Sequence, residues 1–141
     1  MHSETRIPKT IHFCWYGKGE YNDTIKKCIK SWEEKLPDYT IKKWDESNTP
    51  FKQFPFLKLI LKQKKWSYIT DFIRLYAIYT EGGIYLDTDI EIVKDFGPLL
   101  NEECFLGFEA EIEKQKYPIN SAVIGSEKGA HFILDLSLIH I

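Results

Sequence analysis

Two aspartates one residue apart, Asp87 and Asp89, have the clearest capacity for chemistry in this sequence. They follow a short apolar run that begins after Gly82 and Gly83, so we expect a buried strand that ends at the aspartates. Ligands of open α/β sheets bind at the carboxyl ends of strands. The hard oxygens of carboxylates suit Mg²⁺ or Mn²⁺ that also contacts substrate phosphates. From the spacing alone, the alternative is a pair of solvated turn aspartates.

Three further side chains could belong to the same site. Asp71 and Arg74 lie three positions apart on a predicted helix, so they share a face. They form either an ordinary surface ion pair or a group in which the arginine meets phosphate oxygens and the aspartate accepts from sugar hydroxyls. Trp15 ends the first predicted strand and is either a core residue or a platform for a nucleobase.

Hydrophobic periodicity and turn residues predict the elements that position these side chains. Asn22 or Asp23 is expected to cap the first helix, Ser67 to cap the helix that carries Arg74, and Gly82 to end that helix. Strands and helices alternate along the chain, which favours an α/β sandwich. Strands are expected at 10–15, 39–44, 83–86, 90–93, 104–108 and 121–125, and helices at 23–35, 56–61, 67–81 and from 130.

Composition limits the classes of protein. The 141 residues include 43% hydrophobic residues with a net charge of -2, which indicates a globular domain and argues against nucleic acid as a partner. Three cysteines with no C-x-x-C spacing favour a reducing, cytoplasmic compartment. No secretory signal or membrane-spanning run is seen. Lysines 58, 62, 64 and 65 are interpreted as a solvated face, with contact to an acceptor or to the inner face of the membrane as the alternative.

Two other families with paired aspartates fit less well. A calcium loop needs glycine at its sixth position, where this chain has Ile92. A haloacid-dehalogenase-type phosphatase normally continues with glycine and then threonine or valine, where this chain has Ile90 and Glu91. The phosphatase is retained as an alternative enzyme.

The longer pattern resembles a known family of glycosyltransferases. Residues 7–15, IPKTIHFCW, resemble the opening of family 32, which carries a sugar-binding region with a DXD motif. Residues 71–75, DFIRL, followed by residues 79–89, YTEGGIYLDTD, match its central signature. The resemblance covers residues 7–135 and extends to the catalytic domain of the large glucosylating toxins.

This resemblance implies a GT-A-type, Rossmann-like nucleotide-diphospho-sugar transferase fold. It implies metal-dependent transfer of a sugar, with retention of configuration, from a nucleotide sugar to a glycan or lipid-linked acceptor in polysaccharide biosynthesis. Trp15 stacks on the base, Asp71 and Arg74 hold the sugar and diphosphate, and Asp87 contacts ribose and sugar hydroxyls. In the same scheme Asp89 ligates Mn²⁺ or Mg²⁺.

On the acceptor side of that scheme we expect Asn120. The donor is expected to be a UDP-sugar.

Residues 1–135 are expected to be the donor-binding part of a C-terminally truncated domain, because family members continue with a late segment that closes the site. The last six residues, 136–141, back-translate to a sequencing adapter, so we expect a non-native tail. A nucleotide-sugar-binding module without turnover is therefore the non-enzymatic alternative.

Overall fold

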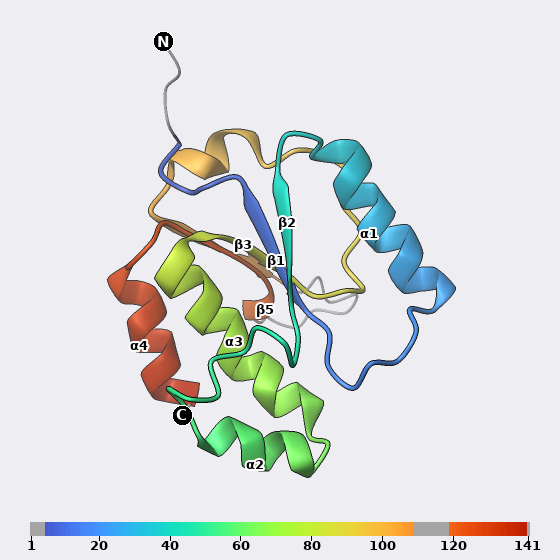
Figure 1. Ribbon diagram of the computed structural model, residues 1–141. Coiled ribbons are helices and arrows are strands. Elements are labelled where there is room, and N and C mark those ends of the chain that lie inside the picture. The colour runs from blue at the N-terminus through green and yellow to red at the C-terminus, as the bar shows by residue number, and fades with distance from the viewer. Residues whose placement is uncertain (1–4, 109–118, 141) are drawn as a thin grey trace, which may run out of the picture.

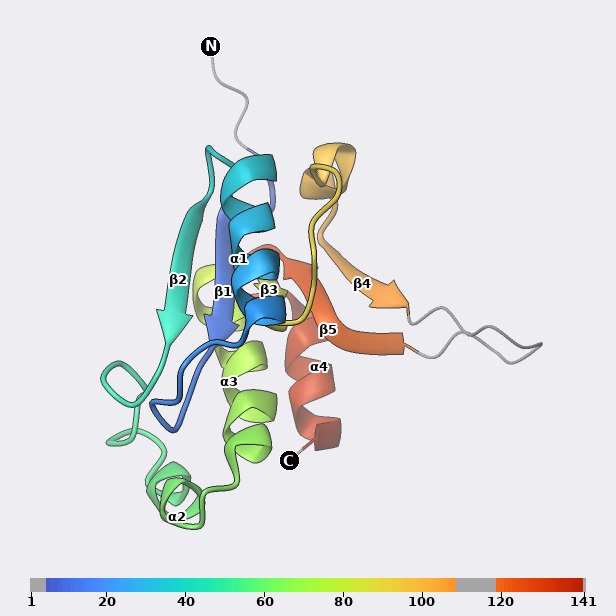
Figure 2. The same cartoon turned by 90° about the vertical axis from the view of Figure 1, so that its right-hand side faces the viewer.

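The computed structural model describes residues 5–108 and 119–140 and shows a five-stranded sheet between helices on its two faces (Figure 1; Figure 2). The α/β class is confirmed. The strands are β1 (Thr10–Cys14), β2 (Thr40–Trp44), β3 (Gly83–Leu86), β4 (Cys104–Phe108) and β5 (Ile119–Ser126). The helices are α1 (Asp23–Lys35), α2 (Phe56–Lys62), α3 (Trp66–Glu81) and α4 (His131–His140), with a short 3-10 helix at Gly97–Asn101.

The sheet has the strand order β2-β1-β3-β5-β4. Strand β1 runs parallel to both β2 and β3, whereas β5 runs antiparallel to β3 and β4. The carboxyl ends of the three parallel strands therefore meet at one edge, with Trp15, Asp45 and Asp87 directly after them. This is the edge at which α/β sheets bind ligands.

Alternation along the central strands produces two cores. Ile11 and Phe13 of β1, with Ile84 of β3, pack in the core under α1. Cys14 of β1 and Tyr85 of β3 point to the opposite face and pack in the core under α3. Because side chains of a strand alternate between faces, each central strand is apolar on both faces, as expected for buried parallel strands. Figure 2 shows α1 on one side of the sheet and α3 and α4 on the other.

The ends of the helices agree only in part with expectation. Asn22 caps α1 through its side-chain oxygen, which accepts from the backbone N–H of Ile25 at 2.8 Å, as predicted. Gly82 ends α3 with φ +73°, a conformation that glycine adopts without strain. The predicted cap of α3 at Ser67 is wrong, because the helix begins at Trp66, whose ring packs against Gly17.

The predicted strand at 90–93 is also wrong. Ile92 is buried in the α1-side core, which explains the apolar alternation. Its backbone N–H donates to the hydroxyl of Ser31 at 2.9 Å, and the carbonyl of Ile90 accepts from the indole N–H of Trp32 at 2.8 Å. Both partners are α1 side chains, so this segment satisfies its backbone on a helix instead of in the sheet.

Residues 109–118, between the strands expected at 104–108 and 121–125, lie outside the described residues. Helix α4 runs through His140 and so includes most of the segment expected to be non-native. The origin of that segment stays a prediction.

Candidate active site

A cleft of about 660 Å³ opens at the carboxyl edge of the parallel strands. Its walls come from the end of β1 and the loop after it, the start of α1, the first turns of α3 and the end of β3. Trp15, Asp87 and Asp89 all line this cleft. The structure therefore brings together three of the predicted site residues from positions more than seventy residues apart in the sequence.

Asp87 is half-buried at the base of the cleft. Burial raises its pKa, and this effect outweighs the neighbouring Arg74 guanidinium and the hydrogen bond from the Tyr85 hydroxyl, which both act in the opposite direction. The Asp89 carboxylate also raises the pKa of Asp87, because two like charges disfavour ionisation. A cation bound nearby would therefore favour the ionised form of Asp87, which burial and the Asp89 charge disfavour.

Asp89 has a different environment from its neighbour. Its side chain is exposed and faces the cleft from the turn after β3. Within the described residues no basic side chain pairs with Asp89. Its oxygens are therefore open to a ligand that enters the cleft.

Arg74 connects the first aspartate of the motif to helix α3. Its side chain is buried, and its Nη2 atom lies 3.5 Å from Asp87 Oδ1 and 3.4 Å from Asp71 Oδ1. The guanidinium lies over the Tyr85 ring, 4.9 Å from the ring centroid, in cation–π geometry. Burial and two carboxylate partners rule out the ordinary surface ion pair that was one interpretation of this spacing.

Asp71 itself has a largely exposed side chain. It lines a separate apolar groove between α2, α3 and α4, on the other side of α3 from the cleft. The structure thus places Asp71 beside Arg74 but does not bring it to the cleft wall with Trp15.

Trp15 is half-buried and forms the boundary between the cleft and a second hollow of about 840 Å³. Its indole N–H donates to the carbonyl of Gly19 at 2.8 Å, and its ring meets Tyr21 edge-to-face at 4.8 Å between centroids. These contacts fix the orientation of the ring. A fully enclosed core tryptophan is therefore excluded, and the stacking role stays a prediction.

The sequence did not single out Tyr85 and Cys14 as part of this site. Tyr85 stands two positions before Asp87, a spacing that puts both on one face of an extended strand and could have indicated the hydrogen bond between them. Cys14 lines the base of the cleft, and burial raises the pKa of its thiol to about 12, so it stays protonated. The backbone of Asn120, in β5, pairs with Gly107 of β4, whereas the Asn120 side chain lies outside the described part of the structure.

The donor set fits a divalent cation. The two carboxylates supply hard oxygen ligands, and the cleft offers no thiolate, since Cys14 is neutral. Within the described residues no group of three metal-binding side chains is found. Mg²⁺ or Mn²⁺ bound through one or two carboxylates and the phosphates of a substrate needs no such group.

The chain is similar in sequence to known proteins. The chain is 29% identical over 133 residues to the Subversion of eukaryotic traffic protein A of Legionella pneumophila, covering 70% of this chain and 20% of that protein. It is 29% identical over 139 residues to Inositol phosphoceramide mannosyltransferase 3 of Schizosaccharomyces pombe, covering 92% of this chain and 36% of that protein. The chain thus spans well under half the length of both relatives.

A solved structure supplies the fold. The PaToxG glycosyltransferase superimposes with a TM-score of 0.66 at 19% identity, covering 91% of this chain and 58% of the other. This match confirms a GT-A-type fold.

The family described as "Glycosyltransferase sugar-binding region containing DXD motif" matches residues 22–106, a range that includes Asp71, Arg74, Asp87 and Asp89. This range is more than half of the chain. The match therefore argues against the alternative of a haloacid-dehalogenase-type phosphatase. The chain therefore belongs to the DXD-motif glycosyltransferases.

Proposed function

We propose that this chain forms the donor-binding part of a metal-dependent, retaining glycosyltransferase. The reaction transfers a sugar from a UDP-sugar to a glycan or lipid-linked acceptor in polysaccharide biosynthesis. One observation carries the proposal: a half-buried aromatic ring and two carboxylates, Trp15, Asp87 and Asp89, line one cleft at the carboxyl edge of the sheet. A nucleotide sugar needs a stacking surface for its base and oxygen ligands beside its diphosphate.

The arrangement assigns a role to each side chain. Trp15 stacks on the base, and its fixed ring lowers the entropic cost of that contact. Asp87 accepts from ribose and sugar hydroxyls, since it lies deeper than Asp89. Arg74 lies between Asp71 and Asp87 and orients the Asp87 carboxylate toward the sugar. Asp71 lies outside the cleft wall, so its contact with the sugar stays a prediction. Tyr85 donates to Asp87 and keeps that carboxylate in one rotamer.

Asp89 would hold the cation. When bound, Mn²⁺ or Mg²⁺ would supply positive charge that offsets the negative charge of a departing nucleoside diphosphate. The exposed position of Asp89 lets it meet a cation that arrives with the nucleotide. Asn120 stays the proposed contact on the acceptor side.

We also propose a cytoplasmic location for this protein. All three cysteines are free, which fits a reducing, cytoplasmic compartment. Among the described residues, no helix has both the length and the apolar character that crossing a bilayer requires.

Turnover of a UDP-sugar tests the proposal. We expect slow, Mn²⁺-dependent hydrolysis of at least one of UDP-glucose, UDP-galactose and UDP-N-acetylglucosamine, with release of the sugar in the α configuration. An EDTA-treated sample and a simple phosphomonoester serve as the controls. Tight binding of UDP without any hydrolysis would establish the binding module without turnover. Hydrolysis of the phosphomonoester with no action on nucleotide sugars would reject the glycosyltransferase role.

A further inference from the structure

The segment from Pro50 to Trp66 is strongly cationic in a chain whose net charge is -2. No acidic residue occurs between Glu46 and Asp71. The segment carries five lysines, Lys52, Lys58, Lys62, Lys64 and Lys65. All five side chains are exposed, and within the described residues none of them forms an ion pair. The positive charge is therefore concentrated on one part of the surface around α2.

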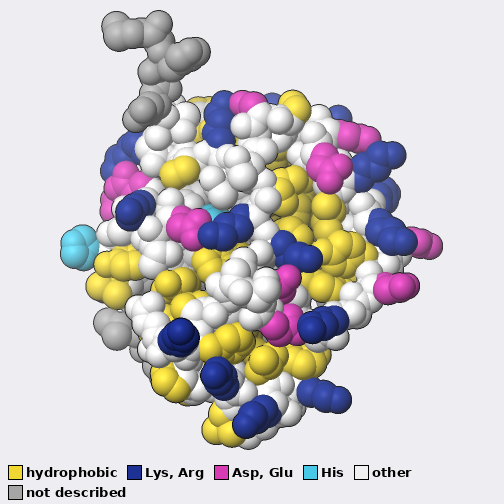
Figure 3. Space-filling model, in the orientation of Figure 1, with side chains coloured by type: hydrophobic (Ala, Val, Ile, Leu, Met, Phe, Trp, Pro, Cys, Tyr) yellow, Lys and Arg dark blue, Asp and Glu magenta, His cyan; other side chains and the backbone are white. Residues whose placement is uncertain are grey.

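Large apolar side chains are exposed among these lysines. Phe56 is 47% exposed, Leu59 is 60% exposed and Tyr68 is 58% exposed. Leu57, between the first two, is fully buried and anchors α2 on the core. The lower part of Figure 3, over α2, shows dark blue and yellow side chains next to one another. We call these five lysines with Phe56, Leu59 and Tyr68 the α2 surface.

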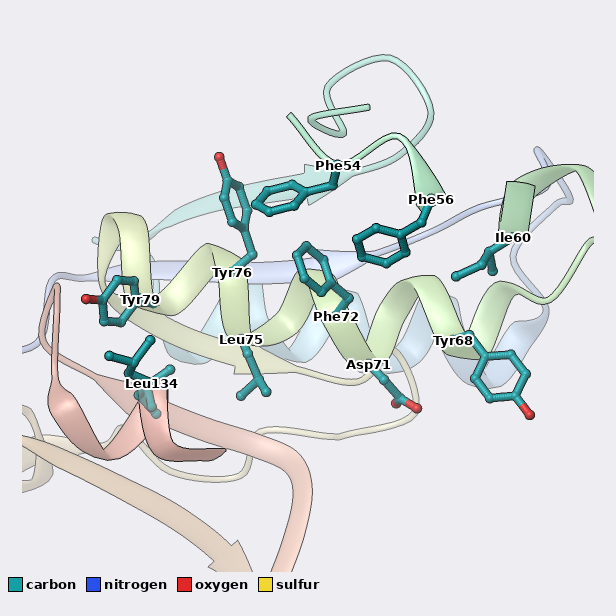
Figure 4. A pocket seen from close by; sticks show the side chains of 11 residues that line it. Phe54, Phe56, Ile60, Tyr68, Asp71, Phe72, Leu75, Tyr76, Tyr79 and Leu134 are labelled. Carbon is teal, nitrogen blue, oxygen red and sulfur yellow. The ribbon is translucent and has the colours of Figure 1, made fainter. Parts of the chain in front are cut away.

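An apolar groove of about 400 Å³ extends the α2 surface between α2, α3 and α4. Figure 4 shows Phe56 and Ile60 of α2 and Tyr68 of α3 at one end of this groove, with Phe72 and Leu75 further along α3. Phe56 packs edge-to-face on Phe72 at 5.4 Å between ring centroids. The apolar area therefore continues inward from the exposed residues instead of ending at isolated side chains.

We propose that the α2 surface docks on an anionic lipid bilayer. Lysines attract an anionic leaflet, and exposed leucine and phenylalanine side chains enter the boundary between headgroups and acyl chains. The strength of such binding rises with both the apolar area that enters the membrane and the attraction to anionic lipids, and the α2 surface offers both. A surface for nucleic acid needs the charge but has no use for exposed Leu59 and Phe56, so the combination favours a lipid surface.

Docking here places the cleft beside the bilayer. Trp66 and Ser67 line the cleft, and they stand between Lys65 and Tyr68 of the α2 surface. A lipid-linked acceptor in the same membrane is then presented next to the donor. This consequence rests on the proposed function, whereas docking itself does not.

Flotation with lipid vesicles, in the absence of any nucleotide sugar, tests the docking. We expect the chain to float with vesicles of phosphatidylcholine and phosphatidylglycerol but not with phosphatidylcholine alone. Each lysine near an anionic leaflet strengthens binding about fivefold, so reversing Lys58, Lys62 and Lys65 to glutamate is expected to weaken binding by at least about 100-fold. The matched control reverses Lys35, Lys94 and Lys128, which are exposed elsewhere, and changes the net charge equally.

A second pair of variants tests the apolar part. Leu59→Ser is expected to weaken vesicle binding about tenfold, because burial of a leucine side chain is lost. Val93→Ser is the control, since Val93 is 77% exposed and lies outside the α2 surface. Two results would show general attraction to polyanions and overturn the proposal. One is an equal loss of vesicle binding in the control lysine variant. The other is unchanged vesicle binding of Leu59→Ser together with displacement of the chain from vesicles by added RNA. Retained flotation with no donor hydrolysis would support docking and reject only the proposed function.

Discussion

The two sides of helix α3 face different kinds of environment. On one side, Trp66, Ser67 and Thr70 line the cleft that contains the aspartate pair. On the other side, Phe72 and Tyr76 line the apolar groove against α2 and α4. Helical periodicity alone separates these two sets, because residues three or four apart share a face.

This comparison separates binding from stability. The cleft is lined by exposed or half-exposed polar side chains such as Asp87 and Asp89, so its side chains are expected to govern ligand affinity. The groove holds rings that pack on each other, such as Phe72 on Phe54 at 4.7 Å between centroids, so its side chains are expected to govern folding. Arg74 lies between the two, buried in the helix and joined to Asp87.

Asp89→Asn is expected to give the largest effect on the cleft side. Removing the charge is expected to weaken binding of Mn²⁺ in the presence of UDP by about 100-fold or more. Mutation of residues that only support a metal ligand already lowers metal affinity by about 10–100-fold, so loss of a ligand is expected to cost at least as much. The urea midpoint stays unchanged, because Asp89 is exposed. Calorimetric titration of Mn²⁺ measures the affinity. Unchanged Mn²⁺ affinity would falsify the metal role of Asp89.

Phe72→Ala is expected to give the converse result on the groove side. The ring contacts Phe54, Phe56 and Tyr76 but is only partly buried, so its loss destabilises the chain by about 2 kcal/mol, below the 3–5 kcal/mol of a fully buried phenylalanine. Affinity for UDP stays within about twofold of the unmodified chain. Urea denaturation and calorimetry on the same sample check both. A large loss of UDP affinity would break the separation between the two sides of α3.

Trp15→Ala tests the other end of the cleft. Loss of a stacking platform is expected to weaken binding of UDP by about 1–3 kcal/mol. Trp15→Phe is the matched control, because it keeps an aromatic face and loses only the indole N–H bond to Gly19. If Trp15→Ala instead unfolds the chain, then the tryptophan serves the core and the base binds elsewhere.

His12 of β1 is expected to give a smaller effect, which is a dependence of the free energy of unfolding on pH. It is fully buried, its Nδ1 atom accepts from the indole N–H of Trp44 at 3.0 Å, and its Nε2–H donates to the carbonyl of Gly82 at 2.9 Å, so the neutral ring satisfies both contacts. Burial lowers its pKa. The unfolded chain therefore binds more protons below a pH of about 6.5, and stability falls as the pH drops from there toward the lowered pKa.

We expect His12→Gln to remove that part of the pH dependence, which amounts to about 1 kcal/mol per pH unit. Urea midpoints of both proteins at a pH of about 7 and about 5.5 measure it. The same decrease in both proteins would assign the pH dependence to other groups.

Much of the fold could be predicted because local pattern and tertiary structure agree. The apolar alternation of β1 and β3, the Asn22 cap and the stop at Gly82 each depend on nearby residues. The segment after Asp89 shows where this fails. Its alternation comes from packing on α1, and its backbone partners, Ser31 and Trp32, lie about sixty positions away in the sequence.

The charged residues of the site could be predicted from the sequence, whereas the residues that contact and position them, such as Tyr85, could not. Paired aspartates indicate a ligand site by type and spacing, whereas the contacts of Tyr85 depend on where Arg74 is buried. That burial follows from the packing of α3 on the sheet, which no local pattern encodes. The groove could not be predicted from local sequence either, since its lining residues come from three helices and from the loop before α2.

The central claim is that the cleft binds a nucleotide sugar together with a divalent cation. Urea unfolding in the presence of UDP-sugar and Mn²⁺ tests it most directly. At a donor concentration 100 times the Kd, we predict that the free energy of unfolding rises by about 2.7 kcal/mol and that the gain disappears when EDTA removes the metal. No gain with UDP-, GDP- or ADP-sugars in saturating Mn²⁺ would contradict the assignment of this cleft as a donor site.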